Sequence, residues 1–113
     1  MLAQADIVSL HVRLNDATRN MIGAAQLARM KRGALLINTA RGGLVDEPAL
    51  LAALRSGHLA GTGLDVFATE PLPKGHPLLA MVNVVMTPVS AWNTADASRR
   101  MNRQSVDNVV GVL

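Results

Sequence analysis

The chain has 113 residues, 50% of them hydrophobic and 17% charged, with a net charge of +3 at pH 7, which is enough for one small domain or part of one. No apolar run is long enough to cross a bilayer, and the scattered arginines and lysines with only two aromatic residues do not form a nucleic-acid surface, so we expect neither a membrane nor a nucleic-acid partner. The absence of cysteine excludes disulfide frameworks and Cys-ligated zinc, and residues 1–12 lack the pattern of a secretory signal, so cytoplasm is the default location.

The first third of the chain predicts a strand, a helix and a second strand. Residues 6–12 form a short and nearly continuous apolar run rich in β-branched residues, which is typical of a strand buried on both faces. Residues 24–31 have helical spacing of apolar positions, and Gly33 is a plausible stop. The apolar run 34–39 predicts the second buried strand.

The middle of the chain continues this alternation. Asp46 is a good N-cap residue, Pro48 fits the first turn, and Gly57 can end the helix between them. Residues 59–66 then predict a third strand, in which two glycines allow close approach of a neighbouring element. Residues 82–86 predict a fourth.

A proline-rich loop and a last helix complete the predicted elements. Pro71, Pro73 and Pro77 restrict the backbone and remove donors, so the segment between the third and fourth strands must be a loop. A helix is expected from Thr94 onward, capped by Asn93 or Thr94. Its apolar stripe consists of Ala97, Met101, Val106, Val109, Val110 and Leu113.

Strands that alternate with helices of this length predict a parallel sheet in a layered α/β fold. In such sheets ligands bind at the carboxyl ends of the strands. This rule selects four segments, namely residues 11–14, 39–43, 65–71 and 87–94. The polar clusters of the sequence fall in these segments.

Arg41 follows a buried strand directly and would project from the carboxyl edge of the sheet. There it could hold a carboxylate through two parallel hydrogen bonds, or it could simply reach solvent or pair with a nearby acid. Position alone gives the two alternatives equal weight. Asp65 and Glu70 stand at the end of the third strand, where they could serve a ligand or a neighbouring imidazole, although turn capping by Asp65 and solvation of Glu70 are the simpler expectation.

Three histidines are the candidate proton carriers near neutral pH. His58 follows a helix end, where a solvated or dipole-facing role is expected, and His76 precedes Pro77 in a loop, where we expect a structural or exposed residue. His11 ends a strand and could face a ligand or be satisfied as a polar edge group. No pair has metal-ligand spacing, so no metal site is expected.

Taken together, these segments resemble the D-isomer-specific 2-hydroxyacid dehydrogenase family, and within it the glycerate and hydroxypyruvate reductases. The resemblance covers nearly the whole chain, and its most specific stretch is Leu36 to Glu47, with the core Asn38-Thr39-Ala40-Arg41-Gly42-Gly43. It is followed at family spacing by Leu64-Asp65-Val66, Glu70-Pro71 and His76-Pro77-Leu78-Leu79. The resemblance implies the second half of a Rossmann-like, doubly wound NAD-binding domain, with about four strands and flanking helices over residues 1–113.

The resemblance also implies roles for individual residues. Arg41 would grip the carboxylate of a 2-oxo or 2-hydroxy acid substrate, and Glu70 would pair with the catalytic histidine. The residues implied for NAD or NADP binding are Val12, Thr39, Ala40, Arg41 and Asp65. Arg13 stands where the family usually has proline.

The chain departs from the family pattern in two respects. Val89 occupies the position at which the family has its proton-donating histidine, and a valine side chain has no transferable proton. The GxGxxG turn that holds the pyrophosphate does not occur in these 113 residues, and neither does the substrate domain. We therefore expect a fragment or degenerate member of the family that is inactive alone, or alternatively a non-catalytic binding or regulatory homologue.

The first strand of this half would normally pair with a strand of the first half of the domain. Without that neighbour an apolar edge is exposed, and an exposed edge invites pairing. We therefore expect a homodimer or completion by further segments of a longer polypeptide.

Overall fold

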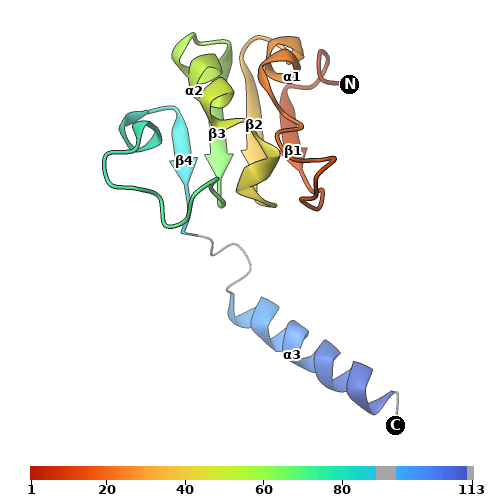
Figure 1. Ribbon diagram of the computed structural model, residues 1–113. Helices are drawn as coiled ribbons and strands as arrows, with labels where there is room; N and C mark the ends of the chain where they lie inside the picture. The colour runs from red at the N-terminus through yellow and green to blue at the C-terminus, as the bar shows by residue number, and fades with distance from the viewer. Residues whose placement is uncertain (89–93, 112–113) are drawn as a thin grey trace.

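The computed structural model describes residues 1–88 and 94–111. Its centre is a parallel sheet of the strands β1 (Ile7–Leu10), β2 (Ala34–Asn38), β3 (Leu59–Leu64) and β4 (Val84–Met86). The spatial order is β1-β2-β3-β4, so strands that follow one another in the chain are neighbours in the sheet (Figure 1). This confirms the predicted α/β fold with a parallel sheet, and each predicted strand is present with its ends shifted by a few residues.

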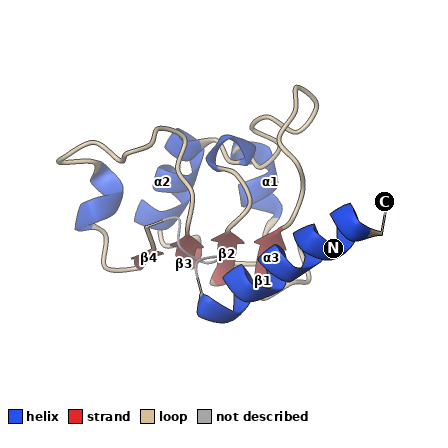
Figure 2. Cartoon of the chain, turned by 90° about the horizontal axis from the view of Figure 1, so that it is seen from below, coloured by secondary structure: helices blue, strands red, loops and turns tan. Residues whose placement is uncertain are grey.

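Two helices cover one face of the sheet, α1 (Ala24–Arg29) and α2 (Glu47–Arg55) (Figure 2). Asp46 caps α2 as predicted, because its carboxylate accepts a hydrogen bond from the Ala49 N–H at 3.2 Å. The core lies between these helices and the sheet. Its fully buried leucines are Leu27, Leu36, Leu44, Leu50, Leu59 and Leu78.

The expectation that the first strand is buried on both faces is wrong. Leu10 faces the core, but Ile7 is 60% exposed and Ser9 is exposed as well. In β4, at the opposite edge of the sheet, Val85 is 71% exposed. The reason is that α1 and α2 cover the same face, and among residues 1–88 and 94–111 no helix covers the opposite face of the strands (Figure 2).

The connection from β3 to β4 is the predicted proline-rich loop, and it contains one 3-10 turn, η2 (Pro77–Ala80). A second 3-10 turn, η1 (Gly42–Leu44), follows β2. Both turns pack a leucine into the core, since Leu44 and Leu78 are fully buried. The loops after β2 and β3 are thereby anchored to the body of the domain.

The last helix, α3 (Ala95–Val110), extends away from the sheet (Figure 1). Thr94 caps it, accepting the Ala97 N–H at 3.1 Å, whereas Asn93, the other predicted cap, lies outside the described residues. The predicted apolar stripe is exposed at Met101, Val106 and Val110. Within residues 1–88 and 94–111, no helix is long and apolar enough to span a membrane.

Candidate functional site

All four strands end at one edge of the sheet. The register pairs Leu10 with Asn38, Asn38 with Leu64, and Leu64 with Met86, so the carboxyl ends of the strands are level. The loops that follow them carry every polar segment that the sequence singles out and the structure describes. This edge is where α/β sheets bind ligands.

A cavity of about 460 Å³ lies at this edge between the ends of β1 and β2. We call it the β1–β2 cavity, and its lining residues are His11, Val12, Arg13, Leu14, Thr39, Ala40 and Arg41. It therefore brings together four of the five residues expected to bind the cofactor, namely Val12, Thr39, Ala40 and Arg41. Asp65, the fifth, lies at the end of β3.

The turn that carries Arg41 is shaped by a buried asparagine. Asn38 is 1% exposed, its amide donates to the Arg41 carbonyl at 2.9 Å, and its side-chain oxygen accepts the Ala40 N–H at 3.1 Å. This role of Asn38 was not predicted from the sequence. The available signal was a polar residue at the end of an apolar strand, because such a buried amide needs local partners.

Arg41 itself is exposed, and its guanidinium donates to the Ala40 carbonyl at 2.7 Å. Among the ion pairs of the described residues, none involves Arg41. Of the simpler expectations for Arg41, pairing with a nearby acid is not seen in the described part of the chain, whereas its exposure agrees with a side chain that reaches solvent. Its guanidinium lines the cavity and retains donors for an anion.

The loop after β1 forms the other wall of the β1–β2 cavity. The His11 ring lies with Nε2 at 2.8 Å from the Ser9 hydroxyl, so its partner is a polar group of the same strand edge. Farther along, the Thr18 hydroxyl donates to the Arg13 carbonyl at 2.8 Å. The Asn15 side-chain oxygen accepts the N–H groups of Ala17 and Thr18 at 3.0 and 3.1 Å. These hydrogen bonds give the loop a defined conformation.

A second cavity, of about 450 Å³, lies at the ends of β3 and β4 and is called here the β3–β4 cavity. Its walls are mostly apolar, formed by Phe67, Pro71, Leu72, Leu79, Met86 and Pro88, with Glu70 and Thr87 as the polar members. The Glu70 carboxylate accepts the Phe67 N–H at 2.9 Å through Oε1. Glu70 thus closes its own turn while remaining exposed.

Asp65 has a different environment from the one expected for a turn cap. It is 4% exposed, and its Oδ1 accepts a hydrogen bond from the Thr87 hydroxyl on the segment after β4. The expectation that Glu70 is only solvated is therefore wrong. Glu70 caps the turn, whereas Asp65 joins the ends of β3 and β4.

The loops of the two cavities touch at Gly42. A Cβ atom at this position would lie 2.0 Å from the carbonyl carbon and oxygen of Phe67, which is possible only for glycine. The segment after Arg41 therefore packs directly against the segment that leads to Glu70. This contact of Gly42 was not predicted from the sequence.

The family resemblance gives Arg41, Asp65, Glu70 and position 89 a part in one site, and the structure places only some of them close together. Arg41 lines the β1–β2 cavity, Glu70 lines the β3–β4 cavity, and Asp65 is buried at the end of β3. All three lie at the same sheet edge, but in two adjacent cavities. Val89 lies outside the described residues.

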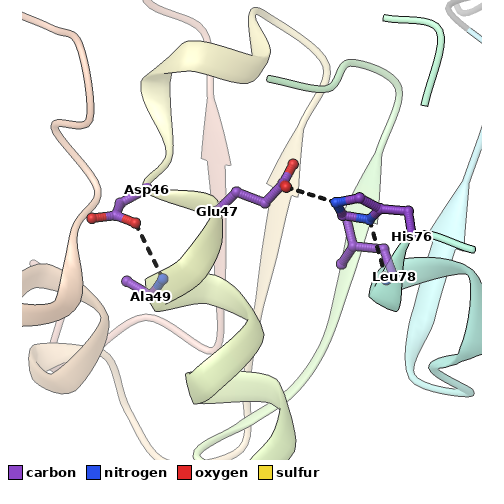
Figure 3. A network of polar contacts seen from close by, with 5 residues as sticks. All are labelled: Asp46, Glu47, Ala49, His76 and Leu78. Carbon is purple, nitrogen blue, oxygen red and sulfur yellow. Dashed lines mark hydrogen bonds and ion pairs between the residues drawn. The ribbon is translucent and has the colours of Figure 1, made fainter. Parts of the chain in front are cut away.

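The other two histidines have structural contacts. His58 Nε2 lies 3.0 and 3.1 Å from the carbonyl oxygens of Leu27 and Met30, at the C-terminal end of α1, in keeping with the expected dipole-facing role. His76 Nε2 contacts Glu47 Oε1 at 2.9 Å, and its Nδ1 accepts the Leu78 N–H at 3.3 Å (Figure 3). This pair ties the proline-rich loop to the first turn of α2. Within the described ranges, no group of side chains could hold a metal ion.

Comparison with known proteins identifies the family. Residues 1–91 match the family model described as D-isomer specific 2-hydroxyacid dehydrogenase, NAD binding domain. A glycerate dehydrogenase of Methylorubrum extorquens is 51% identical over 111 residues, which are 96% of this chain and 35% of that protein. A glyoxylate reductase of Korarchaeum cryptofilum is 47% identical over 97% of this chain and 33% of its own length.

Solved structures agree with this. A D-isomer specific 2-hydroxyacid dehydrogenase from Xanthobacter autotrophicus Py2, in complex with NADPH and MES, is 55% identical with a TM-score of 0.76, covering 78% of this chain and 29% of that one. The NAD-complexed enzyme from Lactobacillus delbrueckii ssp. bulgaricus is 43% identical with a TM-score of 0.87, covering 98% and 39%. The chain spans about a third of the length of the curated relatives that it matches. The protein belongs to the D-isomer specific 2-hydroxyacid dehydrogenase family, and the residues that match are those of its NAD-binding domain.

Proposed function

We propose that this chain forms the nicotinamide side of the cofactor site of an NAD(P)-dependent dehydrogenase that acts on a 2-oxo or 2-hydroxy acid. The observation that carries the proposal is the β1–β2 cavity, where Val12, Thr39, Ala40 and Arg41 meet at the carboxyl edge of the sheet. Arg41 has no carboxylate partner there among the described ion pairs.

The residues present fit a nicotinamide dinucleotide. The cavity lies at the carboxyl ends of parallel strands, and its volume falls within the range of about 300–1,000 Å³ that is usual for small-molecule sites. Val12 and Ala40 offer apolar surface, while Thr39 offers a hydroxyl. Asp65, one strand along, is buried and accepts the Thr87 hydroxyl, so we propose that it supports the site by joining the ends of β3 and β4.

The proposed roles of the charged residues follow from their chemistry. The bound cofactor would supply or accept the hydride. Arg41 would hold the substrate carboxylate through its planar guanidinium and so orient the carbon that changes oxidation state. Glu70 would hold the imidazole of a histidine at position 89, as in the Val89→His variant, in its protonated form, and its Oε1 is already oriented by the Phe67 N–H.

Proton transfer lacks its expected donor, because the chain has Val89 where the family has histidine. Reduction of a 2-oxo acid needs a proton at the new alkoxide, and Val89 cannot supply one. General acid catalysis contributes about 10²- to 10⁴-fold, so we propose that the chain has little or no activity by itself. The lack of a GxGxxG turn in these residues also predicts a low affinity for the dinucleotide.

The test is to compare the parent sequence with Val89→His for reduction of glyoxylate and hydroxypyruvate, using NADH and NADPH, in the complete gene product. We expect the histidine variant to be faster by about the contribution of a general acid, 10²- to 10⁴-fold. An ordinary turnover number for the valine form would refute the assignment of Val89. Removing Arg41 in the same background, as Arg41→Gln, should raise KM for the acid.

A second candidate function is a non-catalytic module that acts through contacts between proteins, in a cytoplasmic setting. Two observations favour it: Val89 in the sequence, and the uncovered sheet face with Ile7 and Val85 exposed. Large exposed apolar patches mark interaction surfaces. Sedimentation equilibrium tests whether this face pairs with a second copy of the chain, and a stable monomer would count against such pairing.

A further inference from the structure

The β1–β2 cavity carries more positive charge than Arg41 alone supplies. Arg13 also lines it, together with His11, and no aspartate or glutamate is among the lining residues. The ion pairs of the described residues are Lys31–Asp6, His76–Glu47 and Arg99–Asp96, so neither cavity arginine is neutralised by an acid there. Unpaired guanidinium groups around one cavity form a binding site for an anion.

From this arrangement we infer that Arg13 binds a phosphate group of the dinucleotide. The inference rests on the proposed function of the cavity as the cofactor site. It adds a residue that the family resemblance does not supply, since proline is usual at this position and proline has no charge. The Arg13 guanidinium presents parallel N–H donors that match two phosphate oxygens, which a proline or a lysine does not.

The choice of phosphate follows from the charges of the ligands. A simple 2-oxo acid such as glyoxylate carries one carboxylate, and Arg41 is assigned to it. Once the substrate carboxylate is assigned to Arg41, the only negatively charged groups left on the two ligands are the phosphates of the cofactor. Arg13 is next to Val12 in the chain, and both residues line the same cavity. Because Val12 is proposed to contact the cofactor, the anion bound by Arg13 is assigned to the cofactor as well.

The backbone of Arg13 is fixed by hydrogen bonds within its loop. The Thr18 hydroxyl donates to its carbonyl at 2.8 Å, and the Asn15 backbone N–H donates to the same hydroxyl at 2.8 Å. The next residue, Leu14, lies over the turn after β2, where a Cβ on Gly43 would be 3.1 Å from its Cδ2. A residue on a fixed loop loses less conformational entropy on binding than one on a loose segment.

Two phosphate sources are possible, the pyrophosphate that NADH and NADPH share and the 2′-phosphate that only NADPH has. The experiment is isothermal titration of the complete gene product with NADH, NADPH and 2′,5′-ADP, for the parent and for Arg13→Gln, Arg13→Lys and Arg55→Gln. Arg55 is an exposed arginine in the last turn of α2, outside both cavities, so its variant loses the same charge elsewhere. Circular dichroism confirms that each variant is folded.

We expect Arg13→Gln to weaken dinucleotide binding by about tenfold or more, Arg13→Lys to restore part of the affinity, and Arg55→Gln to bind like the parent. The loss should also shrink at high salt, because exposed charges are screened. An equal loss for both dinucleotides assigns Arg13 to the pyrophosphate, and a loss confined to NADPH and 2′,5′-ADP assigns it to the 2′-phosphate.

Two results would overturn the inference, and only one of them would also overturn the proposed function of the cavity. If the parent binds dinucleotide and Arg13→Gln binds equally well, the role of Arg13 is wrong while the cavity remains the cofactor site. If the parent binds neither dinucleotide at millimolar concentration, the proposed function of the cavity fails together with the role of Arg13.

Discussion

The side-chain amide of Asn38 donates a hydrogen bond to the backbone carbonyl of Arg41 at 2.9 Å, from a position that is 1% exposed. The last residue of β2 thereby determines the course of the turn that presents the guanidinium to the β1–β2 cavity. A buried residue that touches no ligand thus positions the residue proposed to bind one.

Replacement of Asn38 by alanine should destabilise the fold by about 1–3 kcal/mol, because it leaves the Ala40 N–H and the Arg41 carbonyl without their partner. The free energy of unfolding in urea measures this. Asn102→Ala, which changes an exposed asparagine of α3, is the control and should be nearly neutral. Equal effects at the two positions would show that the Asn38 hydrogen bonds contribute nothing.

Gly42→Ala should be among the more disruptive single-methyl changes in this chain. The added carbon would lie 2.0 Å from backbone atoms of Phe67, so the loops after β2 and β3 must separate, at a cost of about 1–3 kcal/mol or more. Gly23→Ala is the matched control, since its nearest contact would be an ordinary 3.5 Å. Thermal unfolding of both variants tests the contact, and an unchanged midpoint for Gly42→Ala would contradict it.

Thr87→Val should lower stability by about 1–3 kcal/mol, because it removes a hydroxyl that donates to the buried Asp65 carboxylate. Thr87→Ser keeps the donor and should retain most of the stability. If valine and serine behave alike, the effect comes from side-chain shape and not from the hydrogen bond. Urea unfolding monitored by circular dichroism distinguishes the two cases.

The contact between His76 and Glu47 should hold the proline-rich loop against α2. Glu47→Ala removes it, and we expect faster hydrogen exchange at the amides of η2, including Leu78, whose N–H donates to His76. Glu47→Gln keeps an acceptor for the imidazole and should change exchange much less. Protection that is the same in all three proteins would show that the loop is held by its buried leucine alone.

Much of the fold was predictable from local pattern. The apolar runs at 34–39 and 59–66 and the capped helix after Asp46 are in the structure close to where spacing and cap chemistry placed them. The family motif around Arg41 lies at the carboxyl edge of the sheet, as the strand pattern predicted. These features depend on residues that are near one another in the chain, which is why a single sequence carries them.

Other features depend on contacts between distant segments, and no local pattern reports them. The exposure of Ile7 follows from α1 and α2 covering the same face. The contact of Gly42 with Phe67 and the bond of Asp65 to Thr87 join loops that are 22 or more residues apart. Spacing along the chain predicts which residues share an element, but the packing of one loop on another decides which side chains meet, and it places Arg41 and Glu70 in two adjacent cavities of one sheet edge.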